Sequence, residues 1–152
     1  MSSRFASLAV SAVLVAANLA GAEKRVTMEN LPPAVQKTIQ EQSQGATVRG
    51  FSKEEENGKT FYEAELKVNG HNKDLLIDPT GAIVEIEEQV TLESLPPAVK
   101  TALDKHAAKG KIAFVESVTK GGSVIAYEAK IKTAGKTSEI RLSPEGAAVK
   151  EP

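Results

Sequence analysis

Few side chains in this chain are of the types that carry out catalysis or bind metals. The sequence contains no cysteine, which excludes thiol catalysis, thiolate metal sites and disulfide bonds. Its two histidines, His71 and His106, belong to no His-x-x-x-His or Glu-x-x-His pattern, and the Gly-x-Ser-x-Gly nucleophile motif is missing. Because a hydrolase or a zinc site needs several such residues to converge, we expect a protein that is not an enzyme and has no cofactor or metal centre.

The run Glu54-Glu55-Glu56 is the strongest candidate for binding a hard cation such as Ca²⁺ through carboxylate oxygens. A calcium loop places its carboxylates at alternating positions around a glycine bend, and this run has neither feature. Consecutive charges before the Asn57-Gly58 turn signal are typical of a solvated segment that protects a sheet edge. We interpret Glu85, Glu87 and Glu88 in the same way.

The elements that position these side chains occur twice. Thr27 to Ile39 returns 64 residues later as Thr91 to Leu103, with seven of the thirteen positions identical, and after one inserted residue the similarity continues. We therefore predict two copies of one unit, residues 26–88 and 89–150. Each copy alone would bury only a thin core, so we expect both to pack as one domain.

Each copy begins with Leu-Pro-Pro-Ala-Val. The residue before a proline avoids helical backbone, and a proline is well tolerated in the first helical turn, so the helices are predicted to begin at Pro33 and Pro97. Gly45 and Gly110 are predicted to end them. The apolar stripe of each helix repeats at a spacing of four and comprises Leu31, Val35 and Ile39, and Leu95, Val99 and Leu103.

Strand patterns follow each helix. Apolar and charged residues alternate at Tyr62-Glu63-Ala64-Glu65-Leu66-Lys67-Val68 and at Tyr127-Glu128-Ala129-Lys130-Ile131-Lys132. A period of two with one charged side is typical of antiparallel strands that bury one face only, and Asn-Gly and Pro-x-Gly turn signals separate the runs. We predict an α+β fold: a tandem repeat of a helix followed by a four-stranded antiparallel meander, with the helices packed on one sheet face. The tyrosines could line a binding site, but their apolar side of the strand favours core packing.

The charged sheet face is the candidate surface for a partner. The eight residues predicted to contact it are Glu63, Glu65, Lys67, Glu128, Lys130, Lys132, Glu139 and Arg141. Residues 26–88 hold 6 basic and 12 acidic side chains, whereas residues 89–152 hold 10 basic and 7 acidic ones. This asymmetry has two interpretations: drift after duplication, or a polarised face that steers a partner of complementary charge.

Residues 1–22 are predicted to be a signal peptide. Arg4 precedes the short apolar run Phe5 to Ala17, and Ala20-Gly21-Ala22 has the small-x-small pattern of a cleavage site before Glu23. An uncleaved anchor is the alternative. After cleavage we expect no stable membrane span and a periplasmic or secreted protein. The formal net charge of −1 argues against nucleic acid as a partner.

The Leu-Pro-x-Ala-Val helix start, the Tyr-Glu-Ala strand, the x-Pro-x-Gly hairpin and their tandem order resemble the PepSY-like family of β-lactamase-inhibitor-like proteins over nearly all of Val26 to Lys150. The resemblance implies a secreted or periplasmic protein with two helix-plus-four-strand units. It also implies a non-catalytic role, in which the exposed sheet face binds a protein or peptide of the cell envelope and inhibits or modulates a peptidase or another enzyme. The alternative is a periplasmic protein that binds a small ligand or a metal ion.

Overall fold

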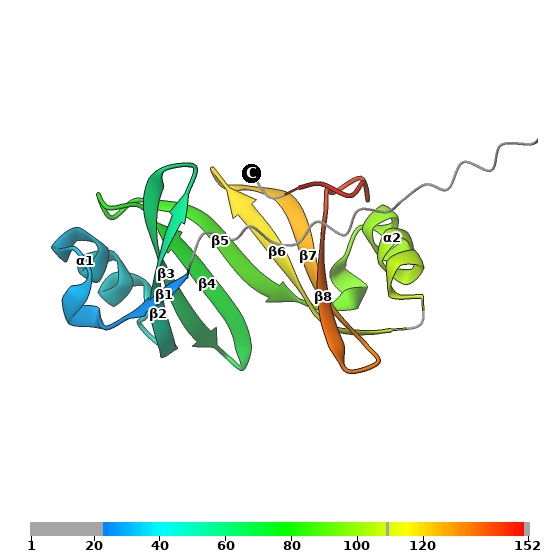
Figure 1. Cartoon of the computed structure of the whole chain (residues 1–152), viewed down its shortest axis with the longest axis horizontal. Helices are drawn as coiled ribbons and strands as arrows, with labels where there is room; N and C mark the ends of the chain where they lie inside the picture. Colours follow the sequence, from blue (N-terminus) through cyan, green and yellow to red (C-terminus); the bar gives the residue numbers. More distant parts are fainter. Residues whose placement is uncertain (1–22, 109, 151–152) are drawn as a thin grey trace, which may run out of the picture.

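The structure is a computed structural model that describes residues 23–108 and 110–150 (Figure 1). The predicted signal peptide lies outside the described residues. Within the described part of the chain, no helix is both long and apolar enough to cross a membrane. The elements, in chain order, are β1 (Lys24–Val26), a 3-10 turn (Met28–Asn30), α1 (Pro33–Gln42), β2 (Thr47–Glu56), β3 (Lys59–Val68), β4 (His71–Ile77), β5 (Ile83–Val90), a second 3-10 turn (Leu92–Ser94), α2 (Pro97–Ala107), β6 (Lys111–Lys120), β7 (Ser123–Thr133) and β8 (Lys136–Leu142).

Both helices begin where the sequence predicts, at Pro33 and Pro97. The preceding prolines are extended, which keeps them outside the helices. The prediction that Gly110 ends α2 is wrong, because α2 ends at Ala107 and its capping residue is Ala108, which has a positive φ of 29°. Gly110 is needed for a different reason: a Cβ there would collide with the Thr133 hydroxyl and the Lys132 carbonyl of β7.

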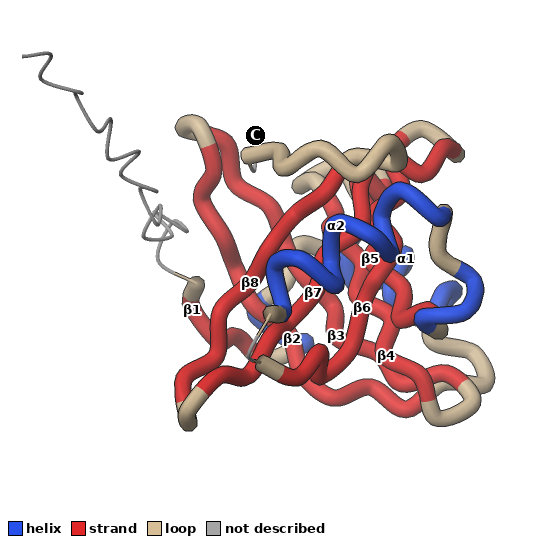
Figure 2. The backbone as a smooth tube through the Cα atoms, turned by 90° about the vertical axis from the view of Figure 1, so that its right-hand side faces the viewer, coloured by secondary structure: helices blue, strands red, loops and turns tan. Residues whose placement is uncertain are grey.

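All eight strands form one antiparallel sheet in the order β1-β2-β3-β4-β5-β6-β7-β8. The two predicted meanders are therefore continuous, because β5 pairs with β4 on one side and with β6 on the other. Figure 1 shows α1 and α2 on the outside of this sheet, near opposite ends of the molecule, and Figure 2 looks onto the end that carries α2. The face between them is left without helical cover, and we call it the inner face.

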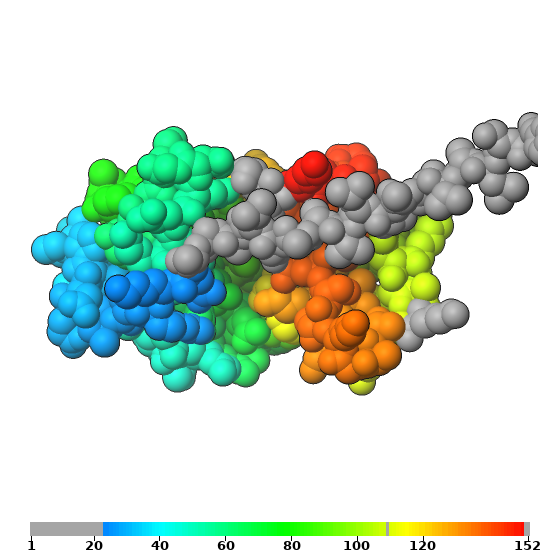
Figure 3. Space-filling view, in the orientation of Figure 1, coloured from blue at the N-terminus to red at the C-terminus, as the bar shows by residue number. Residues whose placement is uncertain are grey.

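The core consists of two apolar clusters on the outer, helix-covered face. The stripe of α1 packs on Ala64, Leu66, Leu75 and Ile77, and the stripe of α2 packs on Val115, Ala129 and Leu142. Tyr62 and Tyr127 are partly buried against these clusters, which confirms their predicted place in the packing. Figure 3 shows the two repeats as the left and right lobes of the molecule.

The duplication extends to the strand register. Val26 opposite Phe51 recurs as Val90 opposite Val115, and the β2–β3 bulge after Val48 recurs between β6 and β7. The inserted residue of the second repeat is Ile125, which is unpaired at a further bulge.

The second repeat differs from the predicted four-stranded meander. Among the residues that follow β8 and are described, the counterpart of β5 is reduced to one bridge between Leu142 and Ala148. The Val149 amide also donates a hydrogen bond to the Arg141 carbonyl. The second repeat therefore contributes three full strands to the sheet.

Candidate functional site

The strand register places all eight predicted partner-binding residues on the inner face. Glu63 and Glu65 of β3, for example, lie opposite Leu76 and Asp74 of β4, while Tyr62 and Ala64, which alternate with them, face the helix. The same alternation in β7 and β8 puts Glu128 opposite Arg141 and Lys130 opposite Glu139. The sequence pattern therefore identified the face correctly, and binding by these residues stays a prediction.

Two of these residues are not the open, solvated charges that the strand pattern suggested. The side chains of Arg141 and Glu128 are each 8% exposed, and they form an ion pair with 2.6 Å between Nη1 and Oε1. Arg141 also reaches Glu85 of β5, at 3.4 Å, and Lys120 Nζ lies 2.6 Å from the other oxygen of Glu85. The interpretation of Glu85 as a solvated charge is therefore wrong.

The contact between Arg141 and Glu85 defines the shape of the second repeat. It joins β8 to β5, which are three strands apart and would be about 14 Å apart in a flat sheet. The sheet must therefore curl inward. Val118 and Ala126 lie on the inner face beneath this contact and are almost completely buried. Ion pairs to Glu128 and to Glu85 of the first repeat therefore bury this part of the inner face, while Lys130 and Glu139 stay partly exposed.

The inner face of the first repeat carries carboxylates with fewer cations. Arg25 of β1 forms an ion pair with Glu65, and the Ser52 hydroxyl donates to Glu63 at 2.9 Å. Glu23, Glu63 and Glu65 bring carboxylate oxygens within 4.8 Å of one another, which is a candidate grouping for a cation. Arg25 already contacts two of these three residues.

Several inner-face carboxyls have raised pKa values. Burial, followed by the charges of Glu128, Glu85 and Glu116, raises the pKa of Glu87 to about 9. Burial and then the charge of Glu63 raise the pKa of Asp74 to about 7. These two carboxyls face each other across β4 and β5, so this part of the inner face binds protons near neutral pH.

Glu54 differs from its neighbours in the acidic run. It lies on the inner face and is partly buried, and burial followed by the charge of Glu63 raises its pKa to about 7. Glu55, by contrast, is exposed on the other face and pairs with Lys53 at 3.1 Å. The interpretation of this run as a solvated edge is thus right for Glu55 and wrong for Glu54.

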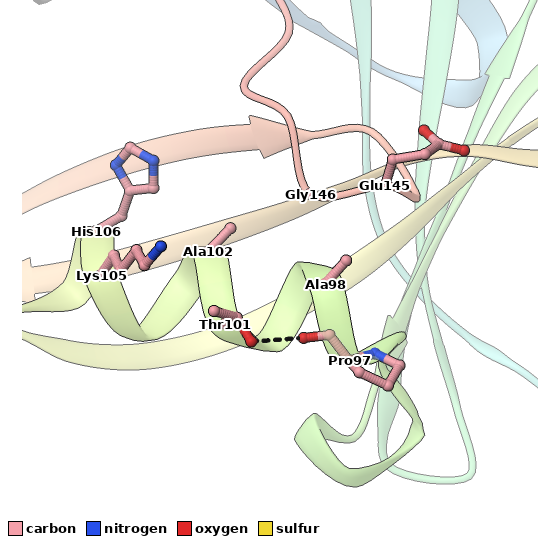
Figure 4. Close-up of a pocket in the computed structure, with 8 residues that line it drawn as sticks. All are labelled: Pro97, Ala98, Thr101, Ala102, Lys105, His106, Glu145 and Gly146. Atoms are coloured by element: carbon pink, nitrogen blue, oxygen red, sulfur yellow. Dashed lines mark hydrogen bonds between the residues drawn. The ribbon is translucent and has the colours of Figure 1, made fainter.

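The histidines lie away from the inner carboxylates. His71 is exposed at the start of β4, and His106 is exposed near the end of α2. Figure 4 shows His106 at the rim of an open hollow of about 520 Å³ between α2 and the turn at Glu145 and Gly146. The hydrogen bond drawn there, from the Thr101 hydroxyl to the Pro97 carbonyl, lies within α2 and joins residues one turn apart. Among its described lining residues, no hydrogen bond or ion pair joins the polar side chains of Thr101, Lys105, His106 and Glu145 to one another.

Comparisons with known proteins identify the fold. No family model and no curated protein matches the chain. Among solved structures, a DUF2874 family protein from Bacteroides ovatus is 22% identical with a TM-score of 0.57, and 79% of this chain covers 85% of that one. A BLIP-like protein from Bacteroides fragilis is 21% identical with a TM-score of 0.53, over 80% of this chain and 86% of that one. A protein from Bacteroides eggerthii assigned to the periplasm has a TM-score of 0.61 at 18% identity, over 79% and 86% of the two chains. The chain therefore has the fold of the DUF2874 and BLIP-like structures.

Proposed function

We propose that this chain is an exported, non-catalytic binding protein of the periplasm, whose inner face binds a protein or peptide of the cell envelope. A role as inhibitor or modulator of a peptidase or another enzyme is the form of binding that the fold suggests. The observation that carries the proposal is the continuous eight-stranded sheet, which has helices on one face only. The BLIP-like and periplasmic neighbours support it through their shared fold.

The physical argument concerns what a bare sheet face offers a partner. A broad, curved surface of fixed strands gives room for an interface of standard size without reorganisation of the backbone. Half-buried charges on this face interact more strongly with a partner than fully solvated charges do, because a partner that covers them removes the remaining water. The helices offer less, because they use their apolar stripes to cover the core.

Photo-crosslinking in living cells tests this proposal. A photoreactive amino acid at Lys67 or Glu139 on the inner face is compared with one at Lys37 or Lys100 on the helices. We expect discrete crosslinked products from the inner-face positions only. Crosslinks that arise only from the helix positions would contradict the proposal.

Binding of a metal ion is the second candidate, and the grouping of Glu23, Glu63 and Glu65 favours it. A cation there would displace Arg25 from Glu65. Calcium or zinc that binds the native state should raise the melting temperature near its binding concentration. An unchanged melting temperature in the presence of either ion or of a chelator would rule this function out.

A further inference from the structure

The two repeats differ in charge at equivalent positions of the inner face. Equivalent residues of β3 and β7, and of β4 and β8, are 65 positions apart and share the same register. In the second repeat both inner pairs have opposite charges: Arg141 opposite Glu128 at 2.6 Å, and Lys130 opposite Glu139 at 3.7 Å. In the first repeat the same positions are Leu76 opposite Glu63, and Glu65 opposite Asp74.

The first repeat therefore keeps the carboxylates of this arrangement and lacks its cations. Leu76 stands where the second repeat has Arg141, and Glu65 stands where it has Lys130. Asp74 lies between Glu65 on β3 and Glu87 on β5 and forms no ion pair with the residues that the structure describes. Like charges directly opposite each other destabilise a sheet, and in this row the ion pair with Arg25 compensates Glu65 but not Asp74 or Glu87.

A buried carboxylate lies beside this row. Glu116 of β6 is only 5% exposed, and its register with Gln89 and Glu128 places it on the inner face. It makes no hydrogen bond or ion pair with any residue between 23 and 150 whose side chain is described. Its charge acts on both Asp74 and Glu87. Burial raises the pKa of Glu116 while the charge of Lys130 opposes that rise, but Lys130 forms its ion pair with Glu139. Buried carboxylates are almost always paired, and among the described residues Glu116 has no cation of its own.

We propose that Glu63, Asp74, Glu87 and Glu116, together called the acidic patch, bind an arginine side chain that a partner protein inserts into the inner face. The inserted guanidinium pairs with Glu63 as Arg141 pairs with Glu128 in the second repeat, and the acidic patch adds three carboxylates that the Arg141 site does not have. This inference rests on the proposed function, because it names the chemistry by which the inner face recognises its protein partner.

The second repeat shows why arginine fits better than a metal ion. Arg141 binds carboxylates from two different strands with two nitrogens of one planar group. Calcium requires six to eight oxygens within about 2.6 Å, whereas the acidic patch offers carboxylates fixed on four separate strands. The half-buried Leu76 adds an apolar surface on which the methylene stem of an arginine packs.

The first test uses a synthetic probe and the protein recovered after export. The probe is the acetylated and amidated peptide Gly-Arg-Gly-Arg-Gly, and the control peptide carries citrulline, which is neutral and nearly isosteric, in place of each arginine. We expect NMR shifts at the acidic patch to show at least tenfold tighter binding of the arginine peptide. Equal binding of the two peptides would overturn the proposal. Displacement of the arginine peptide from the acidic patch by millimolar calcium, with calcium binding more tightly, would also overturn it in favour of a metal site.

The second test places the missing cation within the chain. Leu76→Arg copies Arg141 into the first repeat and should weaken arginine-peptide binding at least tenfold without lowering the melting temperature. Leu76→Met is the matched control and should bind within twofold of the native protein. Asp74→Asn removes a patch carboxylate without adding volume and should also weaken binding, which keeps the test decisive if Leu76→Arg folds poorly. Unchanged binding in folded Leu76→Arg or Asp74→Asn would refute the proposal.

The crosslinking experiment separates this inference from the proposed function. If inner-face crosslinks to one partner persist unchanged in Leu76→Arg and Asp74→Asn, the arginine site is wrong while the inner face remains a binding surface. If no inner-face position gives a crosslink, the proposed function itself fails. If the crosslinks weaken in these two variants and persist in Leu76→Met, both conclusions are supported.

Discussion

Replacing Glu87 with glutamine should make the protein more stable at neutral pH. The pKa of Glu87 is raised from its ordinary 4.5 to about 9, first by burial and then by the nearby carboxylates Glu128, Glu85 and Glu116. The folded state therefore binds this proton more tightly than the unfolded chain does. The contribution of this proton to the free energy of unfolding is complete below pH 4.5 and decreases as the pH rises from 4.5 to 9.

The size of the effect follows from this window. Within it, one proton held only by the folded state lowers the free energy of unfolding by about 1.4 kcal/mol per pH unit. Between pH 5 and pH 7 the upper limit is about 2.7 kcal/mol, and relaxation of the site should leave about 1–2 kcal/mol. Glutamine keeps the shape of the protonated acid and cannot ionise, so Glu87→Gln should lose this part of the pH dependence.

Urea unfolding followed by far-ultraviolet circular dichroism measures this effect, which suits a protein without tryptophan. Glu88→Gln is the matched control, because Glu88 is the next residue of β5 and is exposed on the opposite face. We expect the control to follow the native protein within about 0.5 kcal/mol at every pH. If Glu87→Gln and the native protein lose stability in parallel between pH 5 and pH 7, Glu87 ionises normally and the account of the inner face is refuted.

Three further changes test the packing. Arg141→Leu removes the guanidinium that pairs with buried Glu128 and Glu85, of which Glu85 keeps its ion pair with Lys120, and should cost about 3 kcal/mol in unfolding free energy. A loss below about 1 kcal/mol would show that water or Lys120 compensates for the lost guanidinium. Gly110→Ala forces a Cβ against Thr133 and should lower the melting temperature by several degrees. An unchanged melting temperature would mean that β7 shifts to make room without loss of stability. Val90→Asp puts a charge on the strand shared by both repeats and should destabilise both in a single calorimetric transition, whereas two separate transitions in the native protein would show that the repeats unfold independently.

Local features of the sequence were sufficient to predict the repeat, the helix starts and the face of each strand. A proline restricts its own backbone and that of the preceding residue, so Pro33 and Pro97 mark the helix starts without tertiary contacts. The strict alternation in β3 and β7 likewise separates the core side from the charged side, because successive strand side chains point to opposite faces.

Burial on the charged face could not be predicted from alternation. Arg141 and Glu85 meet because four strands curl together, and curvature depends on bulges and packing over the whole sheet. One available signal was missed: Val118 and Ala126 are apolar residues at inner positions of β6 and β7, where a solvated face would carry polar ones. Apolar residues on the charged side of a strand indicate that this side is also covered.

The charge difference between the repeats can now be assigned to particular positions, which bears on its two interpretations. Drift after duplication would scatter charge changes over both faces and would leave inner pairs mismatched in either repeat. Instead, the charges that face each other across β7 and β8 form ion pairs, whereas β3 and β4 oppose Glu65 with Asp74 and leave Glu63 facing Leu76, with Arg25 compensating Glu65 alone. An inner-face carboxylate of the first repeat lacks the cation that the second repeat has at the equivalent position. Such a carboxylate lowers the stability of the protein without a structural benefit. Such departures from internal consistency are expected at functional sites, where a partner supplies the missing interaction. The positions of the mismatches therefore favour a polarised inner face over drift, and they agree with the proposed acidic patch.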